Sequence, residues 1–369
     1  MSNTTRDERE LLSKPGDTIL ETLEHFKMNQ AELAERMGKT PSKINDLISG
    51  KEPITVATSL QLEKVLGIDA QFWLNREINY REKLSRLDQE EALEECIEWL
   101  KQQPIKQLKQ FGYLKSEEVN TAMVAECLQF YGVASTVQWE TLYIDEYATT
   151  SFRKSGVHKT ALGSLAASLR IGEIEVRKRT LPTYSKEGFK QVLTKALTLV
   201  KKHPEDFAQQ LQQLCFEVGV ALIYTICLPK APISGATRWI GGTPLIQLTD
   251  RYKSNDQFWF TFYHEAAHVL LHGKKDVFLE DFEGSLLNLE KEKEADEFAV
   301  KWLLPEDFLE DLPAKITERD ISKIARQLDT HPAIILGRLQ HLNKVSYSFG
   351  STLKMKVALD EVIKEQSNI

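Results

Sequence analysis

Near the start of the chain, apolar residues recur at helical spacing in two short consecutive segments between Asn29 and Gly50. Asn29 and Thr40 are typical N-cap residues, and Pro41 suits the first turn of a helix. Gly38 can adopt the left-handed conformation at which helices end. Two short helices joined by a tight glycine turn predict a helix-turn-helix. Its small core is expected to contain Leu33, Ala34, Ile44, Leu47 and Ile48.

The segments around this motif show no chemistry of their own. The polar residues 1–14 predict a disordered leader, and Pro15 opens a helix behind an N-cap signal. Residues 81–205 repeat apolar positions at helical spacing, with breaks at Pro104 and Gly112, and predict a helical connector. Further helices are predicted for residues 161–179, 189–200 and 207–218.

The pattern changes to that of strands after residue 219. Residues 220–226 are rich in β-branched side chains and predict a strand. Residues 234–240 and 245–248 predict a hairpin across a Gly-Gly-Thr turn. We expect the 234–240 strand to be an edge strand at which an extended substrate adds by β-augmentation. Arg238 and Trp239 are interpreted either as substrate contacts or as a surface ion and a core indole.

The helix predicted after this hairpin, residues 258–272, is apolar on several sides, so we expect it to be buried. It contains His-Glu-x-x-His, which places His264 and His268 one turn apart on the same face. Two imidazoles on one face can take two corners of a tetrahedral zinc site. Glu265 lies beside that face and is a candidate general base for peptide hydrolysis. The alternative is a surface helix with two solvated histidines.

A candidate third ligand follows in the Glu- and Lys-rich residues 290–299. On a helix, Glu292 and Asp296 share a face, so Glu292 can bind zinc while Asp296 accepts a hydrogen bond from a ligating histidine. Glu294 is the alternative ligand, and a solvated charged face is the alternative for the whole helix. His272 lacks the spacing of a third histidine ligand, and we interpret it as a residue behind the ligands or at the rim.

The composition indicates the class of protein and the compartment in which this chemistry is expected. The 369 residues are 42% hydrophobic and 27% charged, as in an ordinary soluble protein with two or three domains. The sequence shows no membrane-length apolar run, no signal peptide and no Cys-x-x-Cys spacing among its 4 cysteines. We therefore expect a cytoplasmic protein with reduced thiols and no membrane partner. The formal net charge of -7 gives no general attraction to nucleic acid.

The region from residue 233 to Pro305 resembles the ImmA/IrrE family of zinc metallopeptidases. The His-Glu-x-x-His helix follows a short sheet and precedes a Glu-containing helix that ends in Leu303-Leu304-Pro305. The resemblance covers roughly the second half of the chain. It implies His264 and His268 as ligands, Glu265 as the base and a downstream glutamate as the third ligand. Members of this family are known for cutting helix-turn-helix repressors.

Residues 15–80 resemble the lambda-repressor-like domains of HigA-type antitoxins, through the helix-turn-helix and the Phe-Trp-Leu-Asn run at 72–75. This segment carries seven basic and ten acidic residues, a formal charge of −3, so non-specific DNA affinity is expected to be weak and we expect a homodimer. A helix-turn-helix used only for protein contacts is the alternative. By position, Ser42, Lys43 and Asn45 are expected to face the major groove, and Gln30 and Lys51 to touch phosphate.

These features together predict a multidomain fold. An all-α lambda-repressor-like helix-turn-helix domain (15–80) precedes the helical connector (81–205) and an α+β zincin-like metallopeptidase domain (206–310). A C-terminal helical lid (311–369) completes the chain and includes a helix pair at 317–327 and 332–342. A second DNA-reading or partner-reading unit is the alternative for that pair.

The predicted function is that of a DNA-binding transcriptional regulator, antitoxin-like, with a Zn²⁺-dependent endopeptidase domain. Its partners are expected to be a double-stranded DNA operator and a specific protein, either a toxin or a repressor. One alternative is a non-catalytic antitoxin or sensor that uses the zincin fold to bind a partner, while the helix-turn-helix autoregulates its operon. A second alternative is a general peptidase whose N-terminal domain only docks partners.

Overall fold

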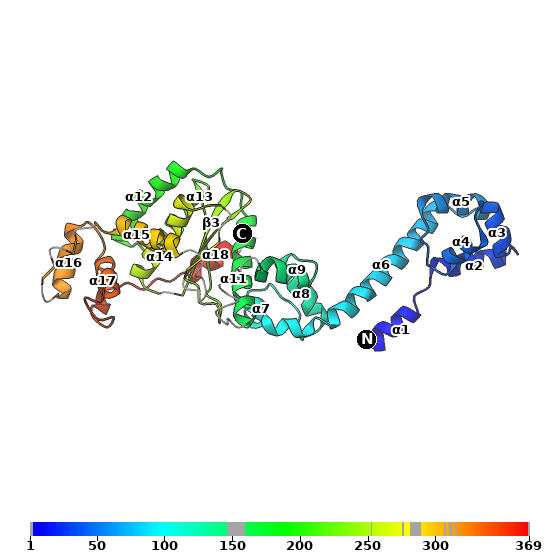
Figure 1. Cartoon of the computed structure of the whole chain (residues 1–369), viewed down its shortest axis with the longest axis horizontal. Coiled ribbons are helices and arrows are strands. Elements are labelled where there is room, and N and C mark those ends of the chain that lie inside the picture. Colours follow the sequence, from blue (N-terminus) through cyan, green and yellow to red (C-terminus); the bar gives the residue numbers. More distant parts are fainter. Residues whose placement is uncertain are drawn as a thin grey trace. The chain divides into compact units, whose positions relative to one another are not determined.

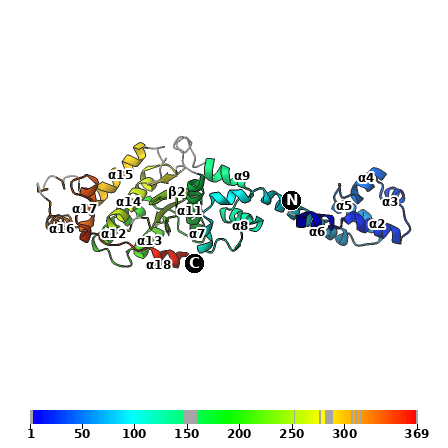
Figure 2. The ribbon, with the colours of Figure 1, turned by 90° about the horizontal axis from the view of Figure 1, so that it is seen from below.

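The computed structural model of the chain is shown in Figures 1 and 2. Two compact units divide the chain: Met1–Glu98 together with Ser116–Ala125, and Trp99–Lys115 together with Glu126–Ile369. No described helix combines the length and the apolar character that crossing a membrane requires. The structure describes residues 3–145, 159–251, 253–274, 277–280, 289–305, 308–309, 312–313 and 316–367.

The N-terminal unit is helical throughout its described elements and has its own apolar core. Leu33, Ile44 and Trp73 are fully buried in it, and the five core residues expected from the sequence are all buried. Gly16 allows α2 to touch α4, because a Cβ there would lie 1.8 Å from the carbonyl oxygen of Ile48. The helices are α1 (Asn3–Glu10), α2 (Pro15–His25), α3 (Gln30–Met37), α4 (Pro41–Ile48), α5 (Val56–Leu66) and α6 (Ala70–Glu94).

The predicted capping of the helix-turn-helix is confirmed. The Asn29 side chain accepts a hydrogen bond from the Glu32 amide at 2.9 Å, which caps α3. Gly38 ends that helix with φ +63°. Thr40 accepts from the Lys43 amide at 3.4 Å and caps α4, with Pro41 in its first turn. The local sequence therefore sets both ends of the turn between the two helices.

Two predictions about this unit are corrected. The leader is helical at Asn3–Glu10 instead of disordered, and Arg9 forms ion pairs with Asp88 at 2.6 Å and Glu91 at 3.2 Å on α6. The expected domain boundary at residue 80 lies inside α6, which continues to Glu94. No glycine or proline interrupts this 25-residue helix, so nothing in its sequence stops it at that point.

The described part of the chain between α6 and the sheet is mainly helical, in agreement with the connector prediction. The helices predicted at 161–179, 189–200 and 207–218 are all found, with ends shifted by no more than three residues. The described elements are the 3₁₀-helix η1 (Ile97–Gln102), α7 (Ile105–Gln110), α8 (Thr121–Tyr131), α9 (Thr136–Trp139), the π-helix η2 (Glu140–Asp145), α11 (Lys159–Arg177), α12 (Lys186–Lys202) and α13 (Phe207–Phe216).

A four-stranded mixed sheet forms the centre of the C-terminal unit, with strand order β1-β3-β2-β4. β1 and β3 are parallel, and β2 is antiparallel to both of its neighbours. The predicted hairpin is confirmed: Ile240 pairs with Thr243, and Gly241 and Gly242 take φ +56° and +92° in the turn. The strands are β1 (Ala221–Thr225), β2 (Gly235–Ile240), β3 (Thr243–Thr249) and β4 (Phe278–Leu279).

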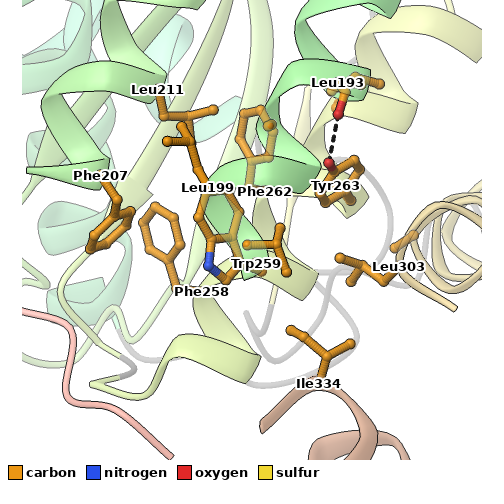
Figure 3. Close-up of a cluster of buried hydrophobic side chains, with 14 of the residues drawn as sticks. Leu193, Leu199, Phe207, Leu211, Phe258, Trp259, Phe262, Tyr263, Leu303 and Ile334 are labelled. Carbon is orange, nitrogen blue, oxygen red and sulfur yellow. Dashed lines mark hydrogen bonds between the residues drawn. The ribbon is translucent and has the colours of Figure 1, made fainter. Parts of the chain in front are cut away.

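Alternate residues of β1 enter two different cores, because side chains alternate across a strand. Leu222 and Tyr224 pack with α12, α13 and α14 (Asn255–Leu271), whereas Ala221 and Ile223 pack with Val176 of α11. Helices therefore cover both faces of the sheet (Figure 2). Figure 3 shows the larger core, in which Phe207, Phe258, Trp259 and Phe262 meet. Tyr263 donates a hydrogen bond from its buried hydroxyl to Leu193 O at 2.8 Å.

The expectation that residues 234–240 form an edge strand is corrected. β4 pairs with Ala236 and Thr237, so β2 lies inside the sheet over these residues. Arg238 is buried and donates hydrogen bonds to Gln247 Oε1 and Leu169 O, on the α11 side of the sheet. It is therefore neither a surface ion nor a group that faces α14. Trp239 is half-buried, and its ring lies 5.3 Å from that of Tyr184.

The remaining helices extend the core around α14. The predicted C-terminal pair is found as α16 and α17, and Ile321, Ile334 and Leu339 share the apolar core of α14. This pair is thus part of the same packed unit as the sheet. Gln366 of α18 pairs with the backbone of Tyr224 and covers the outer side of β1 there. The bounds are α15 (Leu289–Leu303), α16 (Glu318–Gln327), α17 (Pro332–His341), the 3₁₀-helix η4 (Ser351–Leu353) and α18 (Asp360–Ser367).

Candidate metal centre

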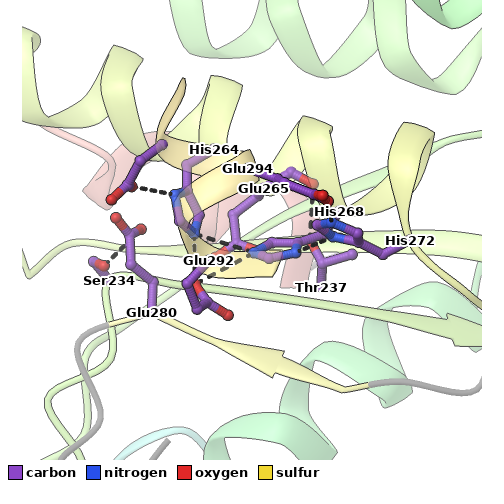
Figure 4. Close-up of polar contacts among 10 residues, drawn as sticks. Ser234, Thr237, His264, Glu265, His268, His272, Glu280, Glu292 and Glu294 are labelled. Atoms are coloured by element: carbon purple, nitrogen blue, oxygen red, sulfur yellow. Dashed lines mark hydrogen bonds and ion pairs between the residues drawn. The ribbon is translucent and has the colours of Figure 1, made fainter. Parts of the chain in front are cut away.

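Helix α14 packs against the sheet and brings His264 and His268 together, and both side chains are buried there. Their Nε2 atoms lie 3.1 Å apart (Figure 4). Burial follows from the sequence, since the helix is apolar on every side around the two histidines. Two ring nitrogens that face each other at this distance need a proton or a cation between them. The two rings can therefore share one proton or bind one cation between them.

Glu292 of α15 completes a group of three. Its Oε2 lies 3.1 Å from His264 Nε2 and 3.6 Å from His268 Nε2. The three side chains offer ligand atoms that all lie within 4.8 Å of one another. Ala295 and Ala299 are fully buried on the face of α15 that meets α14, and their small size allows the two helices to approach closely. A set of two imidazoles and one carboxylate with a free fourth position fits a catalytic zinc ion.

Hydrogen-bond partners of the second ring nitrogen fix the orientation of the two histidines. His264 Nδ1 lies 2.9 Å from Asp296 Oδ1, as expected for a carboxylate that orients a ligating histidine. His268 Nδ1 lies 2.8 Å from His272 Nδ1, whose Nε2 lies 3.1 Å from Glu294 Oε2. Glu294 therefore contacts His272 and not the group of three. His272 thus lies behind His268, which is one of the two places that the sequence interpretation left open for it.

The charges of this cluster are strongly coupled. Burial lowers the pKa of His264, but its hydrogen bonds to Asp296 and Glu292 outweigh this effect and raise the pKa to about 11. Burial is also the main influence on His268 and lowers its pKa to about 4. Burial raises the pKa of Glu292, yet hydrogen bonds to the two histidines bring it to about 2. The Glu292 and Asp296 carboxylates beside His264 thus favour a positive charge at this position, which a bound cation can supply.

Glu265 is fully buried next to this group. Neither carboxylate oxygen has a hydrogen-bond partner among the described residues, and burial raises its pKa well above the usual value. Sequence reasoning missed the residue that makes room for it. A Cβ at Gly235 of β2 would lie 2.3 Å from Glu265 Oε1. An isolated glycine within a strand pattern indicates such a close approach, so a signal was present.

Three further residues around the site had no clear signal in the sequence. Glu280, just after β4, accepts a hydrogen bond from the Ser234 hydroxyl at 2.9 Å (Figure 4). Thr237 donates from its hydroxyl to the Glu265 carbonyl at 3.2 Å and so connects β2 to α14. Phe278 of β4 stacks on the His268 ring with centroids 3.8 Å apart. Only the pairing of β4 with β2 brings Phe278 and Glu280 to α14.

The DNA-reading candidates lie in the other unit. Ser42, Lys43 and Asn45 are exposed on α4, opposite the buried Ile44 and Leu47. The two phosphate candidates, Gln30 at the start of α3 and Lys51 after α4, are exposed as well. An outward polar face on the second helix of a helix-turn-helix is available for the major groove.

The two units define a class: a regulator-type helix-turn-helix joined to a peptidase-type centre of two histidines and a glutamate. Residues 19–73 match the family model described as helix-turn-helix, and residues 217–340 match the Peptidase_M78 model, described as the IrrE N-terminal-like domain. The chain therefore carries a helix-turn-helix domain at residues 19–73 and an IrrE-like domain at residues 217–340. These matches confirm both resemblances and the multidomain fold.

Two curated relatives are similar to part of the chain. The uncharacterized HTH-type transcriptional regulator YddM of Escherichia coli (strain K12) is 36% identical over 62 residues, which cover 17% of this chain and 66% of that protein. Virulence-associated protein I of Dichelobacter nodosus is 32% identical over 77 residues, which cover 21% of this chain and 71% of that protein. Together with the family matches, they support a transcriptional regulator that carries a peptidase-like domain.

Proposed function

We propose that the C-terminal unit is a zinc-dependent endopeptidase that cleaves a specific protein partner, and that the helix-turn-helix binds a DNA operator as a homodimer. The observation that carries the proposal is the convergence of His264 Nε2, His268 Nε2 and Glu292 Oε2 within 4.8 Å of one another. The match of residues 217–340 to a peptidase family supports the class of reaction. The exposed polar face of α4 supports the DNA partner.

In this proposal, His264, His268 and Glu292 hold the ion, and Asp296 and His272 keep the imidazoles in the required orientation. Bound zinc supplies Lewis-acid polarisation of the peptide carbonyl and activation of water. Glu265 acts as general base and returns the proton to the leaving amine. Its unpartnered, buried carboxylate and raised pKa suit a group that must both take and give a proton.

The metal assignment makes a testable prediction. His268→Ala is expected to lose stoichiometric zinc, and Glu292→Gln to weaken zinc binding, because each removes one ligand. Glu294→Gln is the matched control, since its carboxylate contacts His272 instead. Metal content of the purified proteins measures this. Full zinc content in His268→Ala would reject the ligand set, and a larger effect of Glu294→Gln than of Glu292→Gln would move the third ligand by two residues.

The catalytic assignment is tested separately. Glu265→Gln is expected to keep its zinc and to lose cleavage, because Glu265 is not in the ligand set. Proteins that co-purify with Glu265→Gln from the native host are incubated with wild-type protein and with the variant. We expect the wild type to cut one of them and the variant to leave it intact. A bound protein that survives the wild type would favour the alternative, a non-catalytic antitoxin or sensor that uses the same fold to bind its partner.

A further inference from the structure

A cavity of about 240 Å³ lies beside the candidate metal centre, between α14, the end of α15 and α17. A neighbouring cavity of about 350 Å³ shares Phe260, Val300 and Arg338 as walls and reaches Asp296. Asp296 contacts His264, and the Phe260 ring lies 6.2 Å from the His264 ring. The cavities therefore adjoin the place where a peptide bond would be cleaved. The floor of the first cavity is apolar and consists of Phe260, Val300, Leu303, Leu304 and Ile334.

Arg338 of α17 gives this cavity an unpaired positive charge. The side chain is half-buried and makes no ion pair or side-chain hydrogen bond with a described residue. Its Nε atom is buried and has no hydrogen-bond partner among the described residues. Lys354 lines the same cavity, but Asp256 Oδ2 neutralises it at 2.6 Å. A half-buried guanidinium without a counter-ion is costly unless something binds it. The Arg338 side chain is therefore positioned to receive an anionic group.

The other charges on the lining favour a carboxylate over a phosphate. Glu280 also lines the cavity and would repel a dianion more strongly than a monoanion, and one guanidinium suffices for the two oxygens of a carboxylate. The apolar floor suits a methylene stem behind the charged end. The ligand that fits is thus a monoanion on a short apolar stem.

Two acceptors in the same wall indicate that the ligand also carries N–H groups. Asp256 Oδ1 and Gln340 Oε1 are enclosed and have no donor among the described residues. Gln340 uses its amide nitrogen on the carbonyls of Ser346, Tyr347 and Phe349, which fixes the orientation of its oxygen. Enclosed acceptors without a donor are destabilising, and a peptide N–H can supply the missing donor after a small side-chain shift.

We propose that this Arg338 cavity holds an acidic side chain of the protein substrate, next to the bond that is cleaved. The inference rests on the proposed peptidase function and names a specificity determinant for it. Arg338 binds the carboxylate, and the apolar floor takes the methylene groups. A free small-molecule carboxylate offers the same anionic group. It differs from an acidic residue of a protein substrate because it lacks the peptide N–H donors.

The test measures binding without cleavage, in full-length Glu265→Gln protein by ligand-observed NMR. The probes are N-acetylglutamate amide, N-acetylglutamine amide and butyrate, a monoanion on an apolar stem without N–H groups. We expect the glutamate probe to bind at least about tenfold more tightly than the glutamine probe, which has the same shape without the charge. Adding Arg338→Gln is expected to abolish this preference, and adding Arg338→Lys to keep part of it. Adding Arg326→Gln, on α16 outside both cavities, is the matched control and is expected to change nothing.

The outcomes separate the two proposals. Equal affinity for the glutamate and glutamine probes, or a preference that survives Arg338→Gln in protein with unchanged zinc content and urea midpoint, overturns the cavity assignment. Butyrate binding as tightly as N-acetylglutamate amide overturns the peptide source in favour of a small-molecule carboxylate. If the preference and its loss are observed but wild-type protein cuts no captured partner, the peptidase proposal fails while the carboxylate site stands.

Discussion

At the residue scale, Glu265 depends on the absence of a side chain across the sheet. Its carboxylate lies against Gly235, where a Cβ would approach Oε1 to 2.3 Å and Cδ to 2.8 Å. Real Cβ contacts of that length do not occur, so any larger residue must displace the carboxylate or the strand. The adjacent Thr237 holds the backbone of Glu265 at 3.2 Å and limits how far α14 can yield. The position of the proposed base is therefore set by a strand residue outside the histidine motif.

Gly235→Ala is predicted to lower the rate of partner cleavage at least about tenfold while zinc content stays unchanged, because the methyl group moves Glu265 and not the ligands. Ala236→Gly is the matched control, since Ala236 is the next residue of β2 and packs with Leu165 and Leu169 on the opposite face of the sheet. Cleavage assays and metal analysis on the purified variants measure both effects. Wild-type cleavage by Gly235→Ala would show that the carboxylate position does not matter.

His203 offers a second prediction at this scale. Its ring stacks on Phe207 with centroids 4.3 Å apart and accepts from Trp259 Nε1–H at 3.4 Å. Burial, and then the proximity of His331, lower its pKa from 6.5 to about 4. The unfolded chain therefore takes up a proton below about pH 6.5, whereas the folded chain does so only near pH 4. The free energy of unfolding is predicted to fall by roughly 1–2 kcal/mol between pH 7.5 and pH 5 from this residue alone.

Urea unfolding of wild type and His203→Asn at both pH values isolates that contribution. Asparagine tolerates the positive φ of +42° at this position, and any constant cost of the substitution cancels between the two pH values. The stability difference between the two proteins is expected to shrink at pH 5. A difference that is the same at both pH values would contradict the assignment.

At the scale of elements, the two faces of α4 have different roles: one packs in the core and the other is exposed. Ile44 and Leu47 are buried in the N-terminal core, so Ser42, Lys43 and Asn45 must face outward. The amide of Asn45 can pair with a base edge, and Lys43 can contact a base or a phosphate. The acidic balance of residues 15–80 weakens general phosphate attraction, so specificity depends on a few base contacts and on dimer symmetry.

Asn45→Ala is predicted to cost about 1–3 kcal/mol at the specific operator, which we expect to be an inverted repeat with half-sites about one helical turn apart. Lys43→Ala is expected to lower affinity as well. Lys83→Ala, an exposed lysine on α6, serves as the control and should leave binding unchanged. Footprinting on DNA upstream of the gene measures all three. Protection that is unaffected by Asn45→Ala and Lys43→Ala together would favour a helix-turn-helix that only docks proteins.

At the scale of the whole molecule, two separate cores carry the two proposed activities. The N-terminal core contains Leu33, Ile44 and Trp73, and the C-terminal core is built around α14. Each unit has enough buried apolar surface to fold around its own centre. The candidate metal centre lies wholly within the C-terminal unit.

Removal of zinc with a chelator is therefore predicted to leave operator affinity within about twofold of its original value, because the DNA-reading helix does not depend on the metal for its packing. Gel-shift titrations of the full-length protein before and after chelation test this, with Asn45→Ala as the control for specific binding. A tenfold loss of affinity on chelation would instead show that the two units are coupled.

Local sequence was sufficient to predict most elements and to select the candidate site residues on α14. The caps at Asn29 and Thr40, the Gly-Gly hairpin and the spacing of His264 and His268 depend on neighbours within a few residues. Such interactions are short in range, so a pattern of residues specifies them. The same reasoning placed Asp296 behind His264 and left Glu292 and Glu294 as alternatives, because a helix face is readable from spacing.

Tertiary structure alone decided the relations between segments distant in sequence. Packing of α15 on α14 directs Glu292 to the histidines and Glu294 to His272, a choice that spacing within one helix cannot make. Pairing of β4 with β2 removed the expected free edge, and the alternation of β2 turned Arg238 toward α11. The contact of Gly235 with Glu265 and the unpaired Arg338 also arise between elements. These features depend on which faces meet, and that is fixed only when the whole core packs.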